Sequence, residues 1–124
     1  MNAHEIGKKL VALVKEGKNS QAIDELYSEA IVSVEAGSPP GQDRAKHGIE
    51  AVRAKSAWWQ DNHTIHSAEV HGPFPHGEDK FAVRFIYDIT AKHMGDKRFT
   101  MEEIGVFQVA DDKVVREEFF YAMG

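Results

Sequence analysis

The sequence has no cysteine, so disulfide bonds and thiolate chemistry are both excluded. It has no apolar run long enough to span a membrane, and charged residues interrupt its first amphipathic segment every few positions, unlike a signal peptide. No glycine-rich phosphate loop or nucleotide motif is present. The net charge of −5 argues against nucleic-acid binding, which needs a basic surface. We therefore expect a soluble cytoplasmic protein whose partners include neither nucleic acid nor membrane.

The 124 residues are enough for one domain, residues 1–124, with a real hydrophobic core. Apolar residues recur at helical spacing in three segments, residues 3–16, 19–30 and 47–62. Strand-like alternation marks five others, residues 31–36, 63–72, 80–91, 98–109 and 114–123. Helices that are segregated from a mostly antiparallel sheet predict an α+β domain. Such a sheet curls around its helices and tends to leave a cavity at the wide end.

The stretch WWQDNHTIHSAEVHG, residues 58–72, is rich in histidine and raises the possibility of a metal site. Only His63 and His71 share a face of the predicted strand, and they lie roughly 27 Å apart at about 3.4 Å per residue. Zinc ligands must converge to about 2 Å from the ion. We therefore expect no metal site here and no cofactor.

His66 differs from the other histidines of this stretch. Its predicted strand neighbours Thr64, Ala68 and Val70 form the less polar face, so we expect the His66 side chain to point inward. The commonest role of an inward histidine is a hydrogen-bonded core residue, and an acid–base role is the alternative. His63, which follows the third helix directly, is expected at the mouth of the cavity.

Four segments in this order resemble the SnoaL-like branch of the nuclear transport factor 2-like superfamily: EGK, AIDELYSEAIVSVE, HGIEAVRA and FQVADDKVVREEFFYA. The resemblance covers nearly the whole chain. It implies a cone-shaped fold, with three N-terminal helices packed in a curved, mostly antiparallel sheet that encloses a pocket. It also implies a homodimer through the outer sheet face, where Arg84, Ile86 and Asp88 are expected. The superfamily includes ketosteroid isomerases, polyketide cyclases, epoxide hydrolases and dehydratases.

The resemblance also suggests site residues. In ketosteroid isomerases a carboxylate base ends the first strand, and Glu35 occupies that place here. Their first-helix tyrosine corresponds to Leu10, which cannot donate a hydrogen bond. Their late-strand aspartic acid falls near Gly105, with Glu103 two residues earlier on the same face. Since an oxyanion site needs preorganised donors, the sequence departs from the isomerase pattern at two positions.

The resemblance places Glu103 and Glu117 on the inner faces of the last two strands. The candidate catalytic residues are therefore Glu103, Glu117, His66 and Glu35. Pocket-lining candidates are mostly aromatic: Tyr27, Trp58, Trp59, His63, Phe85, Tyr87, Phe107, Phe119 and Tyr121.

Three functions remain open. The first is binding of a small hydrophobic organic molecule, with no reaction assigned. The second is an isomerase, cyclase or dehydratase in which Glu103 or Glu117 takes a proton next to a carbonyl and His66 is the partnering acid. The third is a non-catalytic dimeric interaction module. A structural role is the alternative for each glutamate, as an acceptor for Tyr27, Tyr87 or a tryptophan N–H.

Overall fold

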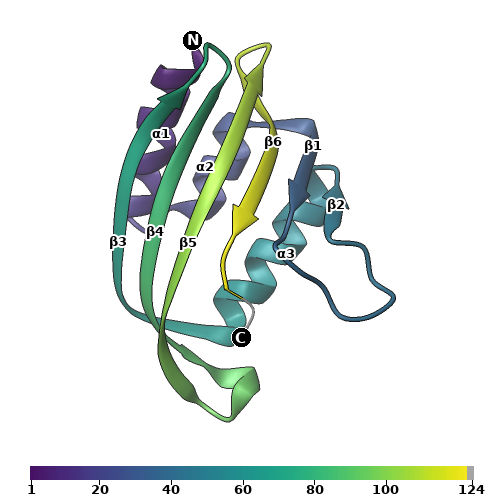
Figure 1. Cartoon of the computed structure of the whole chain (residues 1–124), viewed down its shortest axis with the longest axis vertical. Coiled ribbons are helices and arrows are strands. Elements are labelled where there is room, and N and C mark those ends of the chain that lie inside the picture. Colours follow the sequence, from purple (N-terminus) through teal and green to yellow (C-terminus); the bar gives the residue numbers. More distant parts are fainter. Residues whose placement is uncertain (123–124) are drawn as a thin grey trace.

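The computed structural model describes residues 1–122 and contains three α-helices and six strands (Figure 1). The helices are α1 (Ala3–Lys15), α2 (Asn19–Leu26), α3 (Ile49–Asn62) and the short 3-10 helix η1 (Lys92–Met94). The strands are β1 (Tyr27–Val34), β2 (Ala45–His47), β3 (His63–His76), β4 (Lys80–Ala91), β5 (Lys97–Ala110) and β6 (Lys113–Phe120).

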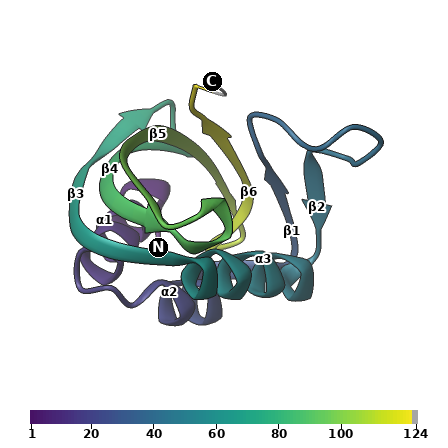
Figure 2. The same cartoon turned by 90° about the horizontal axis from the view of Figure 1, so that it is seen from below.

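The six strands form one sheet in the order β2-β1-β6-β5-β4-β3. All neighbouring strands are antiparallel except β1 and β6, which run parallel. Seen from below, β3 to β6 curve into an arc, and the helices lie along its open side (Figure 2). The sheet is therefore mixed and not closed, and the predicted α+β cone is confirmed.

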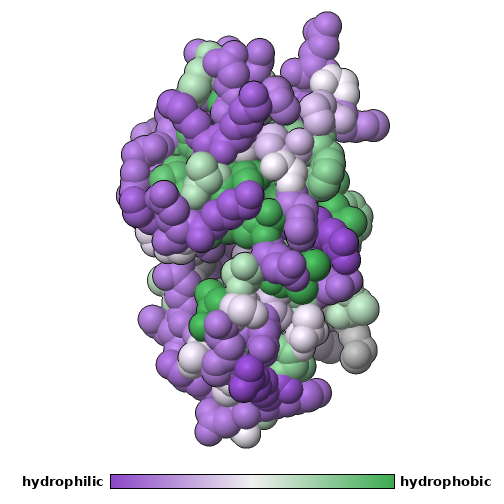
Figure 3. Space-filling view, turned by 90° about the vertical axis from the view of Figure 1, so that its left-hand side faces the viewer, coloured by the Kyte–Doolittle hydropathy of each residue, from purple (hydrophilic) through white to green (hydrophobic). Residues whose placement is uncertain are grey.

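The surface is polar over much of its area. Figure 3 shows a largely hydrophilic face with hydrophobic residues across its middle. On β3, the exposed apolar side chains include Ile65 and Phe74. Within residues 1–122, none of the helices combines the length and the apolar character that a bilayer crossing would need.

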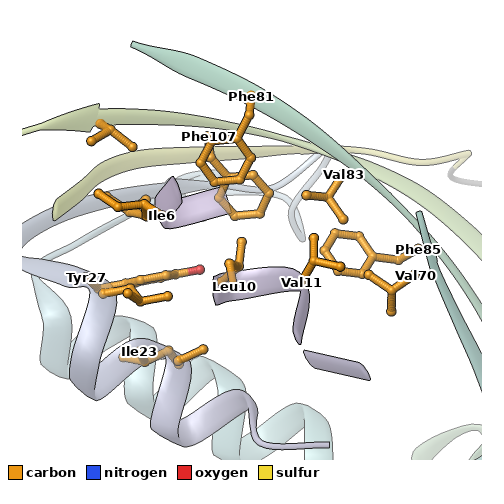
Figure 4. Packing of buried hydrophobic residues seen from close by; sticks show 14 of the residues in the cluster. Ile6, Leu10, Val11, Ile23, Tyr27, Val70, Phe81, Val83, Phe85 and Phe107 are labelled. Carbon is orange, nitrogen blue, oxygen red and sulfur yellow. The ribbon is translucent and has the colours of Figure 1, made fainter. Parts of the chain in front are cut away.

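The core forms where α1 packs on the sheet. The α1 helix begins at Asn2, whose side chain accepts the Glu5 N–H at 2.9 Å, and its apolar face contributes Ile6 and Leu10. These side chains face the stacked rings of Phe81 and Phe107, whose centroids are 5.0 Å apart (Figure 4). Phe81, Phe107 and Ile6 are almost fully buried, so this contact forms the centre of the packing between α1 and the sheet.

Several predicted boundaries were wrong. Helix α2 ends at Leu26 and not at residue 30, because Tyr27 already pairs with Val114 of β6. Strand β2 was not predicted. Strand β3 continues to His76 through Pro73 and Pro75, in a region predicted to be a loop. Prolines are tolerated there because β3 is an edge strand and leaves one row of N–H groups unpaired.

The inward orientation predicted for His66 was also wrong. Ile65 pairs with Ile89 and Ser67 pairs with Asp88, so His66 is the extra residue of a β-bulge. A bulge shifts the in-and-out alternation by one residue. The exposed His66 ring therefore lies outside the cavity, with Nε2 2.7 Å from the Thr90 hydroxyl.

Candidate functional site

A cavity of about 820 Å³ lies between the helices and the inner face of the sheet. Its walls are mainly apolar and aromatic, and include Leu10, Ile23, Val52, Trp59, Phe85, Met101 and Phe107. The 37–46 segment contributes its polar and more exposed lining, at the mouth. This combination of apolar walls and a few converging polar groups is typical of small-molecule sites.

Most of the predicted lining residues border this cavity: Tyr27, Trp58, Trp59, Phe85, Tyr87, Phe107, Phe119 and Tyr121. His63 is the exception. Its ring stacks on Trp59, with centroids 4.5 Å apart, and its Nδ1 donates to the Trp59 carbonyl oxygen at 2.7 Å. His63 thus supports the tryptophan that lines the cavity and does not line it itself.

Of the four predicted catalytic residues, the structure brings the three glutamates to the cavity and leaves His66 outside it. Among residues 1–122, no three His, Asp or Glu side chains lie close enough together to hold one metal ion. The chemistry available to the described side chains at this site therefore centres on its carboxylates.

Glu117 is the most deeply buried of the three, with 3% of its surface exposed. The Tyr27 hydroxyl donates to its Oε1 at 2.6 Å. Burial raises the pKa of Glu117, while the nearby Lys55 charge and the Tyr27 hydrogen bond oppose this rise. Glu117 therefore has the arrangement expected for a structural acceptor of a buried tyrosine.

Glu35, at the end of β1, is held by two donors. Lys55 Nζ donates to Oε1 at 2.7 Å, and the Tyr121 hydroxyl donates to Oε2 at 3.0 Å. The same ammonium group donates to the Ser33 hydroxyl at 2.5 Å and lies 4.9 Å from the centroid of the Phe119 ring. Glu35 is thus the counter-ion of Lys55, and both its oxygens are engaged.

Glu103 is different, because no side chain or backbone group within residues 1–122 donates a hydrogen bond to its carboxyl group. Burial, followed by the negative charges of Glu35 and Glu117, raises its pKa to about 7, and Lys55 opposes this rise. A carboxyl group with such a pKa can take up or release a proton at neutral pH.

The positions that carry donors in ketosteroid isomerases are occupied differently. Leu10 is buried and lines the cavity. At Gly105, an added Cβ would lie 2.8 Å from Phe107 Cε1 and 3.1 Å from Phe119 Cε1. The two rings therefore take the space that a side chain at position 105 would need.

The sequence analysis did not identify Lys55 as a site residue. A signal was present, because Lys55 lies three residues after Val52 and four before Trp59, two apolar residues at helical spacing in the predicted 47–62 helix. A lone lysine within an apolar stripe indicates a buried counter-ion. Ser33 was also missed. The only signal for it is that Ile31, Ser33 and Glu35 are two residues apart and therefore lie on the same face of the strand.

The chain was compared with known proteins. The model of the SnoaL-like domain matches residues 1–121. A solved protein from Mesorhizobium loti, provisionally named a SnoaL-like polyketide cyclase and also a carbohydrate phosphatase, is 40% identical, with a TM-score of 0.90 over 98% of this chain and 100% of that one.

Two more distant structures show the same fold. One, provisionally named an isomerase, is from Bacillus subtilis and is 16% identical, with a TM-score of 0.78 over 98% of this chain and 90% of that one. The other, provisionally named a SnoaL-like polyketide cyclase, is from Jannaschia sp. CCS1 and is 14% identical, with a TM-score of 0.73 over 98% of this chain and 88% of that one. No curated protein matches the chain. The family match over residues 1–121, together with the cone-shaped fold, shows that the chain belongs to the SnoaL-like domain family.

Proposed function

We propose that this protein acts in the cytoplasm, that it binds a hydrophobic organic molecule bearing a carbonyl group in its cavity, and that Glu103 moves a proton next to that carbonyl. The observation that carries this proposal concerns the Glu103 carboxyl group. It lines the mainly apolar cavity, accepts no hydrogen bond from residues 1–122, and has its pKa raised to about 7. The general base of such a reaction works best when its pKa is near the operating pH.

The proposed step uses Glu103 in its ionised form. Its carboxylate takes a proton from the carbon next to the carbonyl: the C–H bond breaks, a carboxyl O–H bond forms, and the electron pair moves to the carbonyl oxygen as an enolate. The same carboxyl then returns the proton to that carbon or to another carbon of the enolate, which restores the carboxylate.

The enolate oxygen needs a hydrogen-bond donor, and Tyr87 is the candidate. Its side chain is buried, lines the cavity, and lies on the strand next to Glu103. Burial and the Glu103 charge raise the pKa of Tyr87, so its hydroxyl stays protonated and able to donate. Tyr27 and Tyr121 already donate to glutamates and are less available.

Two of the names given to similar structures, polyketide cyclase and isomerase, favour this class of reaction, since aldol-type cyclisation and double-bond isomerisation beside a ketone begin with proton transfer next to a carbonyl. Binding without turnover is the second candidate. It is favoured by the hydrogen bonds that occupy Glu117 and Glu35, because these leave one free carboxyl group in the cavity. The open cavity speaks against a purely structural interaction module, which would be expected to fill its core with side chains.

The test is the exchange of deuterium from heavy water into the carbon position next to the carbonyl of bound ketones. The protein is incubated in heavy water with a panel of hydrophobic cyclic ketones, and proton NMR follows the loss of the signals next to the carbonyl. Quenching of Trp58 and Trp59, which line the cavity, reports binding separately. We expect Glu103→Gln to bind as the wild type does and to exchange about 10²–10⁴ times more slowly.

Glu102→Gln is the matched control, because Glu102 neighbours Glu103 on β5 but is exposed on the other face and pairs with Arg84. It should exchange at the wild-type rate. Unchanged exchange in Glu103→Gln would exclude this residue as the base. Binding without exchange in the wild type would leave ligand binding as the function.

We further propose that the chain forms a homodimer through the outer sheet face. Ile104 of β5 lies opposite Phe120 of β6 on that face, and their exposed fractions are 46% and 51%. These adjacent apolar side chains would be removed from water if a second copy of the chain covered this face. Light scattering should give a dimer for the wild type and a monomer for Ile104→Lys. A monomeric wild type would refute the proposed dimer.

A further inference from the structure

Two basic side chains line the mouth of the cavity from the edge strand. Lys46 of β2 lies opposite Ser33 of β1, and the Glu35 N–H donates to the Arg44 carbonyl oxygen at 3.0 Å. Residues that lie opposite each other in an antiparallel pair project from the same face. Ser33 and Glu35 face inward to Lys55, so Arg44 and Lys46 are on the cavity side too, and both contribute to its lining.

Neither cation is paired with a carboxylate of residues 1–122. In the described part of the chain, no carboxylate lies within 4.0 Å of the charged group of Arg44 or Lys46, whereas Lys55 deeper inside is paired with Glu35. Among residues 1–122, the Arg44 guanidinium donates to two backbone carbonyl oxygens, at 3.4 and 3.5 Å. Asp43, the one carboxylate of the 37–46 segment, accepts the Ala45 N–H at 2.9 Å.

The net charge of the chain is −5, whereas these two cations lie together at the mouth of the cavity. The overall charge repels anions, but the lining contributed by residues 37–46 holds two cations, Arg44 and Lys46, and one carboxylate, Asp43. Positive side chains at the entrance of a low-dielectric cavity attract an anionic ligand and hold its charged group at the rim.

We infer that the ligand of this cavity is a hydrophobic organic anion, whose acidic group is bound at the mouth by Arg44 and Lys46 while its apolar body lies against the aromatic walls. This inference rests on the proposed ligand-binding function and specifies its substrate class. Of the inner glutamates, Glu35 is neutralised by Lys55, and the Glu117 carboxyl accepts the Tyr27 hydroxyl. An anionic end at the mouth also orients the rest of the ligand towards Glu103.

Two fluorescent probes with one ring system test this inference. Anilinonaphthalene sulfonate carries an acidic group, and N-phenylnaphthylamine is the same molecule without it. Each is titrated against the wild type, the double variant Arg44→Gln/Lys46→Gln, and Lys8→Gln as a control. Lys8 is an exposed lysine of α1 that does not line the cavity. Ser56→Trp, which fills the cavity from α3, shows whether each probe binds inside.

We expect the wild type to bind the sulfonate probe more tightly than the neutral one. Loss of one partly exposed ion pair weakens binding by about 1.4- to fivefold, so the double variant should lose about two- to thirtyfold for the sulfonate probe. It should bind the neutral probe within about twofold of the wild type, as Lys8→Gln should bind both. Ser56→Trp should abolish binding of both probes.

Equal binding of the sulfonate probe by the wild type and the double variant would overturn the inference, as would an equal loss for both probes. In either case, retained binding of the neutral probe in the wild type would leave the proposed ligand-binding function intact. If neither probe binds the wild type, or if Ser56→Trp binds both unchanged, ligand binding in this cavity is itself refuted.

Discussion

The raised pKa of Glu103 predicts that this residue destabilises the folded protein when it is ionised. Burial raises the pKa from its ordinary value of 4.5 to about 7 in the folded chain. That difference corresponds to about 3 kcal/mol, because each pKa unit is worth about 1.4 kcal/mol. Replacing Glu103 with glutamine, which is similar in shape but never ionised, should remove this cost.

The pH window follows from the two pKa values. Below 4.5, the carboxyl is protonated in both states and costs nothing. Between 4.5 and about 7 the folded state binds more protons than the unfolded state, so stability falls as pH rises. Above about 7 both states are ionised and the full cost is present. From about pH 5 to about pH 8.5, the wild type should therefore lose about 2–3 kcal/mol relative to Glu103→Gln.

Urea unfolding followed by tryptophan fluorescence measures this difference at the two pH values. Glu102→Gln is again the control, because its exposed carboxylate should change stability by less than about 1 kcal/mol at either pH. The comparison cancels the other titrating groups, including Glu117, to the extent that they titrate alike in both proteins. A stability difference between Glu103→Gln and the wild type that is the same at both pH values would refute the reasoning.

Two further predictions concern buried contacts and are measured by urea unfolding near neutral pH. Tyr27→Phe removes the donor of the buried Glu117 carboxyl and should cost about 1–3 kcal/mol, whereas a loss below about 0.5 kcal/mol would mean that this hydrogen bond is not an important part of the fold. Gly105→Ala places a methyl group 2.8 Å from the Phe107 ring and should cost about 1–3 kcal/mol, and an unchanged stability would show that the ring moves freely.

The sequence predicted much of the fold because its alternation is clear where both ends of a strand are fixed by turns. In β4, large apolar residues occupy every second position from Phe81 to Tyr87, and all four are buried. The β5–β6 connection is tight because Asp111 and Asp112 form it in the left-handed conformation of a two-residue hairpin loop.

The errors arose where pairing between strands that are far apart in the sequence determines the end of an element or the orientation of a side chain. The helix-like pattern continues past Leu26, but Tyr27 pairs with β6, whose partner residue Val114 is far away in the sequence. The bulge at His66 depends on how β3 aligns with β4, and the histidine itself carries no signal of it. One extra residue was enough to move a predicted site residue to the opposite face.

The sequence predicted which glutamates lie in the cavity but not the hydrogen bonds that each of them makes. The inward positions of Glu103 and Glu117 followed from the resemblance, whereas their different partners could not be read from the sequence. The contact of Glu117 with the Tyr27 hydroxyl joins β6 to the start of β1. The contact of Glu35 with Lys55 joins the end of β1 to α3. These contacts leave Glu103 as the free carboxyl group.

The central claim is that Glu103 is an unpaired carboxyl group in an apolar cavity, and direct titration tests it. The protein is labelled with ¹³C at the glutamate side-chain carboxyl carbons, and the Glu103 signal is assigned by its absence in Glu103→Gln. We predict that its chemical shift changes with a midpoint near pH 7, about where burial places its pKa. A midpoint near the ordinary value of 4.5 would show a solvated or well-paired carboxylate and would contradict the account.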